Sequence, residues 1–297
     1  MITGALLRIS CLVALALFAF LASPTLIIAG RSDNVKSSAL TDAAPAVHLA
    51  NISTRLPVGT SDNVLIAGFI ITGTQPKKII VRGLGPLLPV SENLSDPTLE
   101  LHDSSGALVA ANDNWRDAQE EGLKATTIPP NNDYESAIVK SLNPGAYTAV
   151  LAGKGVTTGV GLVEVYDLDL TVDSKLANIS TRGFVGQDDN VLIGGAIVLG
   201  SGTTTVIFRA LGPSLASVAK ALQDPVLELH DGQGGLIASN DNWQDSQADA
   251  IRATTIPPTD PREAAIVRQL TPGAYTAIVR GKNNSTGVAL IEAYQIN

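Results

Sequence analysis

The chain contains the stretch DPTLELHDSSGALVAANDNW at Asp96–Trp115, and it returns as DPVLELHDGQGGLIASNDNW at Asp224–Trp243. In each copy, leucines alternate with other residues before an Asp-x-x-Gly turn, and a second apolar run follows that turn. Alternation with a period of two places the leucines on one face of a strand. Two such runs joined by a short glycine-containing turn are typical of a β-hairpin. The stretch therefore predicts antiparallel β structure, and its return predicts that this structure occurs twice.

The repeat extends well beyond this hairpin. Further segments recur at a spacing of about 127–128 residues, and the two copies agree at roughly half of their positions. A period this long indicates duplicated domains rather than a solenoid of short units. We predict two homologous domains, at 49–172 and 173–297. The recurring segments are LANISTR (Leu49–Arg55, Leu176–Arg182), ATTIPP (Ala125–Pro130, Ala253–Pro258) and PGAYTA (Pro144–Ala149, Pro272–Ala277).

Within one copy, apolar or alternating runs are separated by turn residues. VLIAGFII (Val64–Ile71) and KIIVRGLG (Lys78–Gly85) are continuous apolar runs, which indicate strands covered on both faces. Together with LANISTR, the hairpin and the later runs, they give about eight short strands spaced by roughly 8–12 residues, a pattern typical of an antiparallel sandwich. The predicted fold is all-β, with two tandem jelly-roll-like β-sandwich domains. One short helical turn is expected after NDNW, capped by Asp117.

The N-terminal 30 residues have the composition of an export signal. Ile9–Gly30 is apolar apart from Ser10, Ser23 and Thr25, and it follows the single charge of Arg8. An uncleaved membrane anchor is the alternative, because about 20 apolar residues can span a bilayer. Residues 31–48 are polar and aperiodic, which is typical of a linker. We expect a secreted, periplasmic or cell-surface protein that meets a membrane only through an uncleaved N-terminal segment.

Charge and cysteine content exclude several classes of function. The formal net charge is −8, which disfavours nucleic acid and anionic lipid as partners because both bind basic surfaces. An acidic surface suits a soluble exported protein and is compatible with calcium. Cys11 is the only cysteine and lies inside the apolar run, so a chain that has lost its signal has no disulfide, thiol nucleophile or cysteine metal ligand.

The most concentrated polar motif is NDNW-x-D, in a loop that follows the second strand of the hairpin. Calcium takes six to eight oxygen ligands in flexible geometry, and clustered side-chain oxygens on a loop can supply them. The alternative is that Asn and Asp build turns by bonding their own backbone. A later glutamate in each copy is a candidate additional ligand. The candidate calcium ligands are Asn112, Asp113, Asn114, Asp117 and Glu135, with Asn240, Asp241, Asn242, Asp245 and Glu263 in the second copy.

Other residues invite a functional interpretation and have a structural alternative. Trp115 and Trp243 suit sugar stacking if exposed, but a sandwich tryptophan more often packs over the core edge with its N–H on a carbonyl. His102 and His230 each share a strand face with a glutamate, yet zinc needs three or four ligands, and no G-x-S-x-G elbow occurs. We therefore expect no catalytic residues. Charged residues within apolar strands predict one buried ion pair in each copy, from Arg82, Arg209, Glu164 and Glu292.

The pattern D-P-x-L-E-L-H-D-x-x-G-x-L/I-A-x-N-D-N-W, followed by P-G-A-Y-T-A, resembles the pre-peptidase C-terminal domains of secreted bacterial proteins. The resemblance covers roughly 96–152 and 224–280. It implies a jelly-roll-like sandwich, often stabilised by calcium, that acts as an accessory module. By this resemblance the turn acids are Asp103 and Asp231, and the strand-end polar groups are Asn112–Asn114 and Asn240–Asn242. LELH replaces the family's acidic-aromatic start, and the segment from LANISTR to RGLGP lies outside the resemblance; it either completes the sandwich or forms a separate small sheet.

These observations favour a non-catalytic, exported binding or scaffolding protein of the cell surface or extracellular matrix, with calcium as a candidate stabiliser. The expected partner is an extracellular polymer, a surface protein or a polysaccharide. The alternative is a carbohydrate-binding protein that uses Trp115 and Trp243. A secreted hydrolase is the least favoured of the three. Two similar surfaces on one chain would bind a repetitive target more tightly than one.

Overall fold

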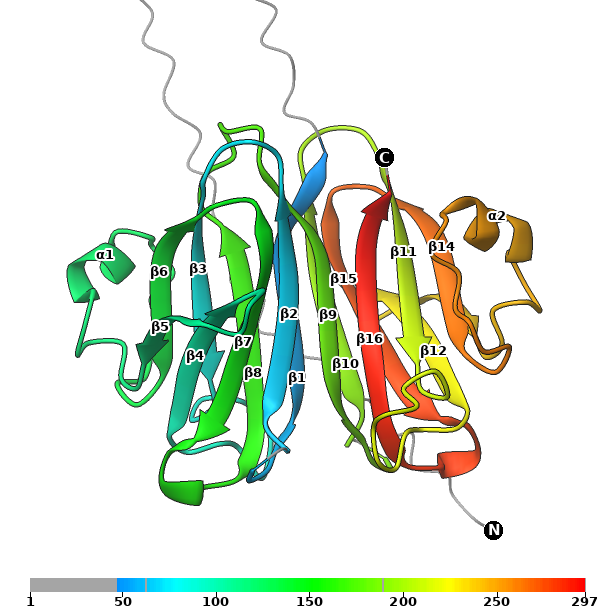
Figure 1. Ribbon diagram of the computed structural model, residues 1–297, viewed down its shortest axis with the longest axis horizontal. Helices are drawn as coiled ribbons and strands as arrows, with labels where there is room; N and C mark the ends of the chain where they lie inside the picture. Colours follow the sequence, from blue (N-terminus) through cyan, green and yellow to red (C-terminus); the bar gives the residue numbers. More distant parts are fainter. Residues whose placement is uncertain (1–46, 62, 189, 297) are drawn as a thin grey trace, which may run out of the picture. The chain divides into compact units, whose positions relative to one another are not determined.

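The computed structural model describes residues 47–61, 63–188 and 190–296, and Ala46–Asn297 forms one compact unit (Figure 1). The predicted signal segment and nearly all of the predicted linker lie outside the described residues. No described helix is long and apolar enough to cross a membrane. Strands dominate the unit, and every ladder between them is antiparallel, as the alternating sequence pattern predicts.

Each copy contributes eight of the sixteen described strands and one short α-helix. The first copy consists of β1 (His48–Val58), β2 (Leu65–Thr72), β3 (Lys77–Leu84), β4 (Pro97–Asp103), β5 (Leu108–Asn112), α1 (Glu120–Lys124), β6 (Ser136–Leu142), β7 (Gly145–Gly153), the 3₁₀ turn η1 (Lys154–Val156) and β8 (Gly159–Asp167). The second consists of β9 (Lys175–Val185), β10 (Leu192–Leu199), β11 (Thr204–Leu211), β12 (Pro225–Asp231), β13 (Leu236–Asn240), α2 (Ala248–Ala253), β14 (Ala264–Leu270), β15 (Gly273–Gly281), the 3₁₀ turn η2 (Lys282–Asn284) and β16 (Gly287–Ile296).

The strands form two hydrogen-bonded runs, and each run draws half of its strands from each copy. One run has the order β5-β4-β7-β2-β9-β16-β11-β14, and the other has the order β13-β12-β15-β10-β1-β8-β3-β6. The single pair Leu49–Leu176 links β1 to β9 and so connects the runs. The copies therefore meet edge to edge twice, through β2–β9 and through β1–β10 (Figure 1).

The LANISTR motif forms the strands at this seam. Its serines lie opposite glycines of the other copy, with Ser180 paired to Gly68 and Ser53 paired to Gly195. A Cβ atom added at Gly68 would come 2.7 Å from the Ser180 Oγ, and one added at Gly195 would overlap the Ser53 Oγ. Because glycine has no side chain, the serine hydroxyls fit opposite it and the two copies can pair closely. The upstream segment thus completes the sandwich rather than forming a separate sheet.

The hydrophobic core is continuous across the seam. One cluster of buried side chains contains Leu49 and Phe69 from the first copy together with Leu176 and Phe208 from the second. In β2 the buried side chains of Leu65, Ala67 and Phe69 alternate with the partly exposed positions Ile66 and Gly68. Burial of this shared apolar surface is the main force that holds the copies together.

The four outer edge strands are of two kinds. On β6, the side-chain amide of Gln119 pairs with the backbone of Val139: Nε2 donates to its carbonyl oxygen (2.9 Å) and Oε1 accepts from its N–H (3.2 Å). Gln247 makes the same two bonds to Val267 on β14. A side-chain amide thus occupies the place of a neighbouring strand, which blocks edge-to-edge association. β5 and β13 pair on one side only with described strands.

The predicted helix cap was wrong. α1 begins after Gln119, which has a left-handed backbone (φ 58°) and makes no side-chain cap bond. Asp117 instead accepts a hydrogen bond from Asn114, so its carboxylate belongs to the preceding turn. The Gln119 amide is committed to β6, and this contact to the sheet fixes the start of the helix. The second copy repeats the arrangement with Gln247 and α2.

Candidate functional site in the NDNW loops

The first asparagine of each NDNW loop fastens the loop to the adjacent layer. Asn112 ends β5; its Nδ2 donates to the carbonyl of Asn114 (3.0 Å), and its Oδ1 accepts from the N–H of Ala137 on β6 (2.8 Å). Asn240 makes the equivalent bonds to Asn242 (3.0 Å) and Ala265 (2.9 Å). Both polar atoms of each amide are already bonded within the protein, so the role of this residue is to shape the loop.

The last two polar residues of the motif bond to each other. Asn114 donates from Nδ2 to the carboxylate of Asp117 (2.9 Å), and the Asp117 N–H returns a bond to the carbonyl of Asn114 (3.0 Å). Asn242 and Asp245 repeat this pair at 2.9 Å. These contacts are those of a side-chain-supported turn. For three of the four loop ligands, the turn-building alternative therefore describes the observed contacts.

The aspartate at the second position of each NDNW motif binds a lysine that sequence reasoning missed. Asp113 lies 2.6 Å from the ammonium nitrogen of Lys154 in η1, and Asp96 lies 4.0 Å from it. In the second copy, Lys282 lies 2.6 Å from Asp241 and 3.6 Å from Asp224. The hydrogen bond to Asp113 raises the pKa of Lys154. Each lysine directly follows the glycine that ends a strand, Gly153 of β7 or Gly281 of β15. The recurrence of this lysine in both copies is the signal that the sequence offered.

The candidate glutamates hydrogen-bond to backbone groups outside the NDNW loops. Glu263 is fully buried, and its Oε1 accepts hydrogen bonds from the N–H of Gly212 (3.0 Å) and the N–H of Ser214 (2.9 Å). Glu135 accepts more weakly from the N–H groups of Gly85 (3.4 Å) and Asn132 (3.3 Å), and burial raises its pKa. These carboxylates hold in place the turns of the recurring segments RGLGP (Arg82–Pro86) and RALGP (Arg209–Pro213). These hydrogen bonds tie both glutamates to turns outside the NDNW loops, and their role as calcium ligands stays a prediction.

What remains for a cation is a small group of acceptor oxygens. In the first copy, the Oδ1 atoms of Asp96, Asp113 and Asn114 are buried and have no hydrogen-bond partner; in the second, the Oδ1 atoms of Asp224 and Asp241 share this state. Among the described residues, no group of three or more His, Cys, Asp or Glu side chains is arranged to hold a metal ion. The lysine ammonium already supplies positive charge to these aspartates, so a calcium ion would have to compete with it.

Both tryptophans are buried beneath the loop and helix of their copy. Trp115 is 3% exposed and Trp243 is 6% exposed, and each packs in a small cluster on the outer side of a sheet. The indole N–H donates to the carbonyl of Asn132 in the first copy and of Asp260 in the second, both at 3.1 Å. Packing with a bonded N–H is thus confirmed. Neither indole presents an open face on which a sugar ring can stack.

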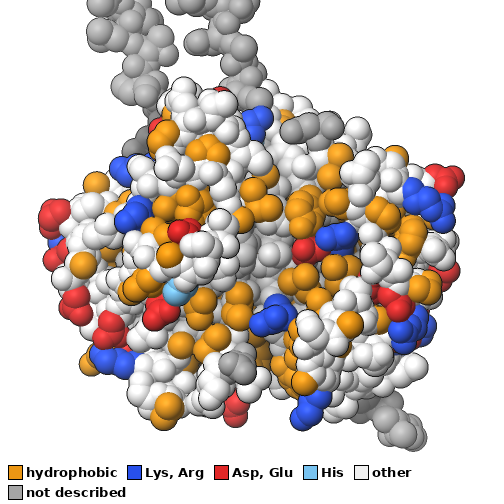
Figure 2. Space-filling model, in the orientation of Figure 1, with side chains coloured by type: hydrophobic (Ala, Val, Ile, Leu, Met, Phe, Trp, Pro, Cys, Tyr) orange, Lys and Arg blue, Asp and Glu red, His pale blue; other side chains and the backbone are white. Residues whose placement is uncertain are grey.

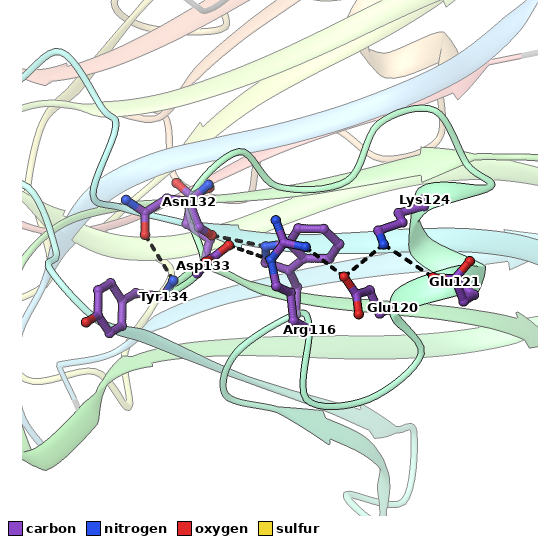
Figure 3. A network of polar contacts seen from close by, with 9 residues as sticks. Arg116, Glu120, Glu121, Lys124, Asn132, Asp133 and Tyr134 are labelled. Carbon is purple, nitrogen blue, oxygen red and sulfur yellow. Dashed lines mark hydrogen bonds and ion pairs between the residues drawn. The ribbon is translucent and has the colours of Figure 1, made fainter.

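A cation covers each indole, although it comes from different positions in the two copies. Arg116 lies 4.3 Å above the Trp115 ring and binds Asp133 and Glu120, while Lys124 binds Glu120 and Glu121 (Figure 3). In the second copy Arg252, at the position of Lys124, lies 5.4 Å from the Trp243 ring. Exposed ion pairs of this kind contribute little to stability individually, and the exposed cation–π contact is also weak.

The predicted ion pairs are present in both copies. Arg82 binds Glu164 through two guanidinium nitrogens and donates to the carbonyl of Ile128 (3.0 Å). Arg209 on β11 binds Glu292 on β16 through Nη2 alone, since its Nε has no hydrogen-bond partner, and its Nη1 donates to the carbonyl of Ile256 (2.8 Å). A tyrosine completes each pair: Tyr294 donates to Glu292 at 3.0 Å, and its burial, together with this carboxylate, raises its pKa to about 12. The interpretation of these charges as register-fixing structural pairs is supported by their position between paired strands.

The hairpins of β4–β5 and β12–β13 display the same surface patch in both copies. His102 lies 2.9 Å from Glu100 through Nε2 and 3.1 Å from the Gly106 carbonyl through Nδ1. His230 makes the equivalent contacts at 3.2 Å each. The residue opposite each histidine in register is a leucine, Leu108 or Leu236, which is 58% or 60% exposed. We call the Glu100–His102–Leu108 and Glu228–His230–Leu236 groups the hairpin patches.

The hydrogen bond to Glu100, with that to Gly106, raises the pKa of His102. Because the folded-state pKa is above the unfolded value of about 6.5, this contribution to stability is complete below that pH and is lost as the pH rises through the folded pKa. We expect an NMR titration of His102 to show the raised pKa and Glu100→Gln to bring it down. Asp103→Asn, which removes a weaker effect, should lower it less; equal effects would contradict the assignment.

Hydrophobic side chains are spread over the face of the unit on which β2, β9 and β16 lie in the foreground (Figure 2). Ile66 on β2 and Val150 on β7 are paired there and remain partly exposed. In the second copy the corresponding Ile193 and Ile278 are 7% and 6% exposed. This part of the surface therefore differs between the copies, whereas the hairpin patches are closely alike.

Comparison with known proteins places the chain in no family. No family model and no curated protein matches it. A DUF4785 family protein from Legionella pneumophila is 11% identical with a TM-score of 0.27; the alignment covers 84% of this chain, and the chain spans 62% of that protein. The major capsid protein P2 of bacteriophage PM2 is 10% identical (TM-score 0.20; 82% and 97% covered). A chain of Sulfolobus Turreted Icosahedral Virus is 10% identical (TM-score 0.24; 84% and 90% covered).

Proposed function

We propose that this protein is a non-catalytic, exported binding or scaffolding protein of the cell surface or extracellular matrix. The observation that carries the proposal is the hairpin patch, which combines an exposed leucine with a bonded Glu–His pair and occurs twice on one compact unit. Exposed apolar side chains rimmed by polar groups are typical of interaction sites. Two copies of one patch on a single body favour a partner with repeating binding positions, such as an extracellular polymer, a polysaccharide or an array of surface proteins.

The internal architecture supports a scaffold. We propose that each copy is a jelly-roll-like domain, because its strands alternate between the layers in the orders β1-β8-β3-β6 and β2-β7-β4-β5. The two domains are fused through both layers, so the distance between the patches is set by the fold. A fixed spacing lowers the entropic cost of a second contact with the same partner. The proposal includes export through residues 1–30 and no enzymatic step.

Binding should depend on the two patches together. We expect Leu108→Glu or Leu236→Glu to weaken adsorption to an envelope fraction of the producing cells modestly, and the double variant to weaken it by on the order of 100-fold or more, because avidity is lost. Sedimentation of the protein with that fraction measures the effect. Leu170→Glu, at an exposed leucine outside the patches, is the matched control. A double variant that binds like the single variants would rule out joint use of the patches.

The carbohydrate-binding alternative requires a different site from the one first predicted. Because Trp115 and Trp243 are buried, a polysaccharide that bound through them would have to displace the covering loops. Binding through the hairpin patches would leave the tryptophan fluorescence nearly unchanged. Strong quenching by a polysaccharide, abolished by Trp243→Phe but retained in the double leucine variant, would favour the tryptophan site over the patches.

Calcium stabilisation remains part of the proposal, at the partnerless oxygens of Asp96, Asp113 and Asn114. Calcium binds oxygen ligands and would compete there with the Lys154 ammonium. After chelator treatment, millimolar calcium should raise the melting temperature of Lys154→Met more than that of the wild type. Lys78→Met, at an exposed lysine, is the control for loss of charge alone. Identical melting temperatures with and without calcium for both Lys154→Met and the wild type would eliminate this site.

A further inference from the structure

A lysine and an aspartate are enclosed together in the interior of the first copy. Lys77, at the start of β3, is 1% exposed, and it is the only lysine or arginine among the described residues that is buried. Its Nζ lies 2.8 Å from the Oδ2 of Asp167, at the end of β8, and both side chains are 1% exposed. The two strands are neighbours, with Ile79 paired to Asp167. The amine and the carboxyl are therefore held side by side, away from solvent.

The contact is unlike the other ion pairs of the chain. Arg82 and Glu164 share aligned hydrogen bonds, whereas the Oδ2 of Asp167 accepts no well-aligned hydrogen bond despite its short distance to Lys77. Lys77 donates instead to the carbonyl oxygen of Asp169 at 2.5 Å. The second copy places Thr204 and Gln295 at the corresponding positions, so it has neither the amine nor the acid. The pair is thus specific to one copy and is not required by the shared fold.

Burial changes which protonation states are favoured. Taking a charged amine and a charged carboxylate out of water is costly, and the neutral forms are favoured by comparison. Burial raises the pKa of Asp167, in opposition to the nearby Lys77 ammonium, which lowers it. Transfer of one proton from the ammonium to the carboxylate produces a neutral amine beside a neutral carboxylic acid. An amine held at this distance has a high effective concentration at the carboxyl carbon.

We propose that Lys77 and Asp167 form an intramolecular isopeptide bond. The Lys77 nitrogen attacks the Asp167 carboxyl carbon and forms a C–N bond; the C–O bond to the hydroxyl breaks, and that hydroxyl leaves with an amine proton as one water molecule. The reaction needs no oxidant, reductant or activated co-substrate. The product is a neutral amide, which removes both buried charges and leaves the amide N–H near the Asp169 carbonyl.

Such a bond would suit an exported scaffold without disulfides. The sequence has one cysteine, Cys11, in the predicted signal, so the described residues contain no thiol to cross-link. The amide would close the chain from β3 to β8 and would be insensitive to reductants. The proposal does not depend on the proposed function, because it rests on the Lys77–Asp167 geometry alone.

Mass spectrometry of the purified full chain under denaturing conditions tests the bond. The intact wild-type protein should be lighter than its sequence by one water molecule, and a protease digest should contain a branched peptide that joins the segments around Lys77 and Asp167. Lys77→Arg and Asp167→Ala should each restore the full mass. Lys78→Arg, at the neighbouring exposed lysine, should keep the mass deficit and the branched peptide.

The digest distinguishes the cross-link from other dehydration. An aspartate that cyclises to a succinimide also loses one water, but it produces no branched peptide and does not require Lys77. A wild-type chain of full mass would overturn the proposal, as would a mass deficit without the branched peptide. Because both readouts come from the wild-type protein, the test holds even if a variant folds poorly.

Discussion

Replacing Gly212 with alanine should lower the free energy of unfolding by about 3 kcal/mol or more, at the upper end of overpacking effects. An added Cβ atom would overlap the carbonyl oxygen of Leu222 and lie 3.0 Å from its carbonyl carbon. This obstacle is backbone, so no side-chain rotation relieves it. The turn cannot simply move away, because the Gly212 N–H is bonded to the buried carboxylate of Glu263.

Denaturant titration followed by circular dichroism measures this loss, and the chain supplies two comparisons. Gly85→Ala places the same atom against the Leu94 carbonyl in the first copy and should have a similar effect. Gly122→Ala lies in α1, where the added atom meets only a Val139 methyl at 3.4 Å, and alanine favours a helix by up to about 1 kcal/mol. If Gly212→Ala were as mild as Gly122→Ala, the described packing of this turn would be incorrect.

Removal of one partner of a buried ion pair should be nearly as damaging. We expect Arg82→Met to cost about 3–5 kcal/mol, because it leaves the Glu164 carboxylate largely buried without its guanidinium. The side chains are 11% and 7% exposed, and Tyr166 donates to the same carboxylate at 3.2 Å. The double variant Arg82→Met/Glu164→Leu should recover much of the loss, since an apolar pair of similar volume can replace a buried ion pair.

A double-mutant cycle by denaturant titration measures the coupling between these residues. Arg262→Met provides the comparison, because the side chains of its pair with Asp260 are 49% and 25% exposed and an exposed pair contributes much less to stability than a buried one. Equal losses for Arg82→Met and Arg262→Met would show that burial does not govern the Arg82 pair. If the double variant were as unstable as Arg82→Met, the ion pair would contribute to the free energy of folding itself rather than only fix the strand register.

The sequence predicted local features well because their causes are local. Alternation in TLELHD, the Asp-x-x-Gly turn and the runs around Phe69 each specify a strand or a turn from neighbouring residues. The ion pair of Arg82 with Glu164 was also accessible, since a charge within an apolar strand requires a partner. Strand partners were not accessible: periodicity fixes the face to which a side chain points, but not which strand lies beside it. The β1–β10 and β2–β9 pairs therefore emerge only in the folded chain.

The candidate site was predicted as a location but not as a set of ligands. NDNW was correctly placed at the end of a strand, yet the direction of each side chain depends on distant groups. Asp113 is drawn to Lys154, which lies 41 residues further along the chain, and Glu135 is drawn to the turn at Gly85. The pairing of the Gln119 side-chain amide with the edge of β6 could not be predicted either, because its partner is the backbone of β6, which carries no sequence signal.

The pairing of the copies at two edges has a consequence for a chain that holds one copy alone. A chain with one copy alone would leave β1 and β2 as open edges, beside apolar residues that the other copy now covers. A second identical chain would close both edges in the same way, with its LANISTR strand in the place of β9. The pairing within this chain thus has the geometry that two separate single-copy chains would use as a homodimer. Because both halves belong to one chain, they need not be identical, and the first half alone carries a buried Lys–Asp pair, Lys77 with Asp167.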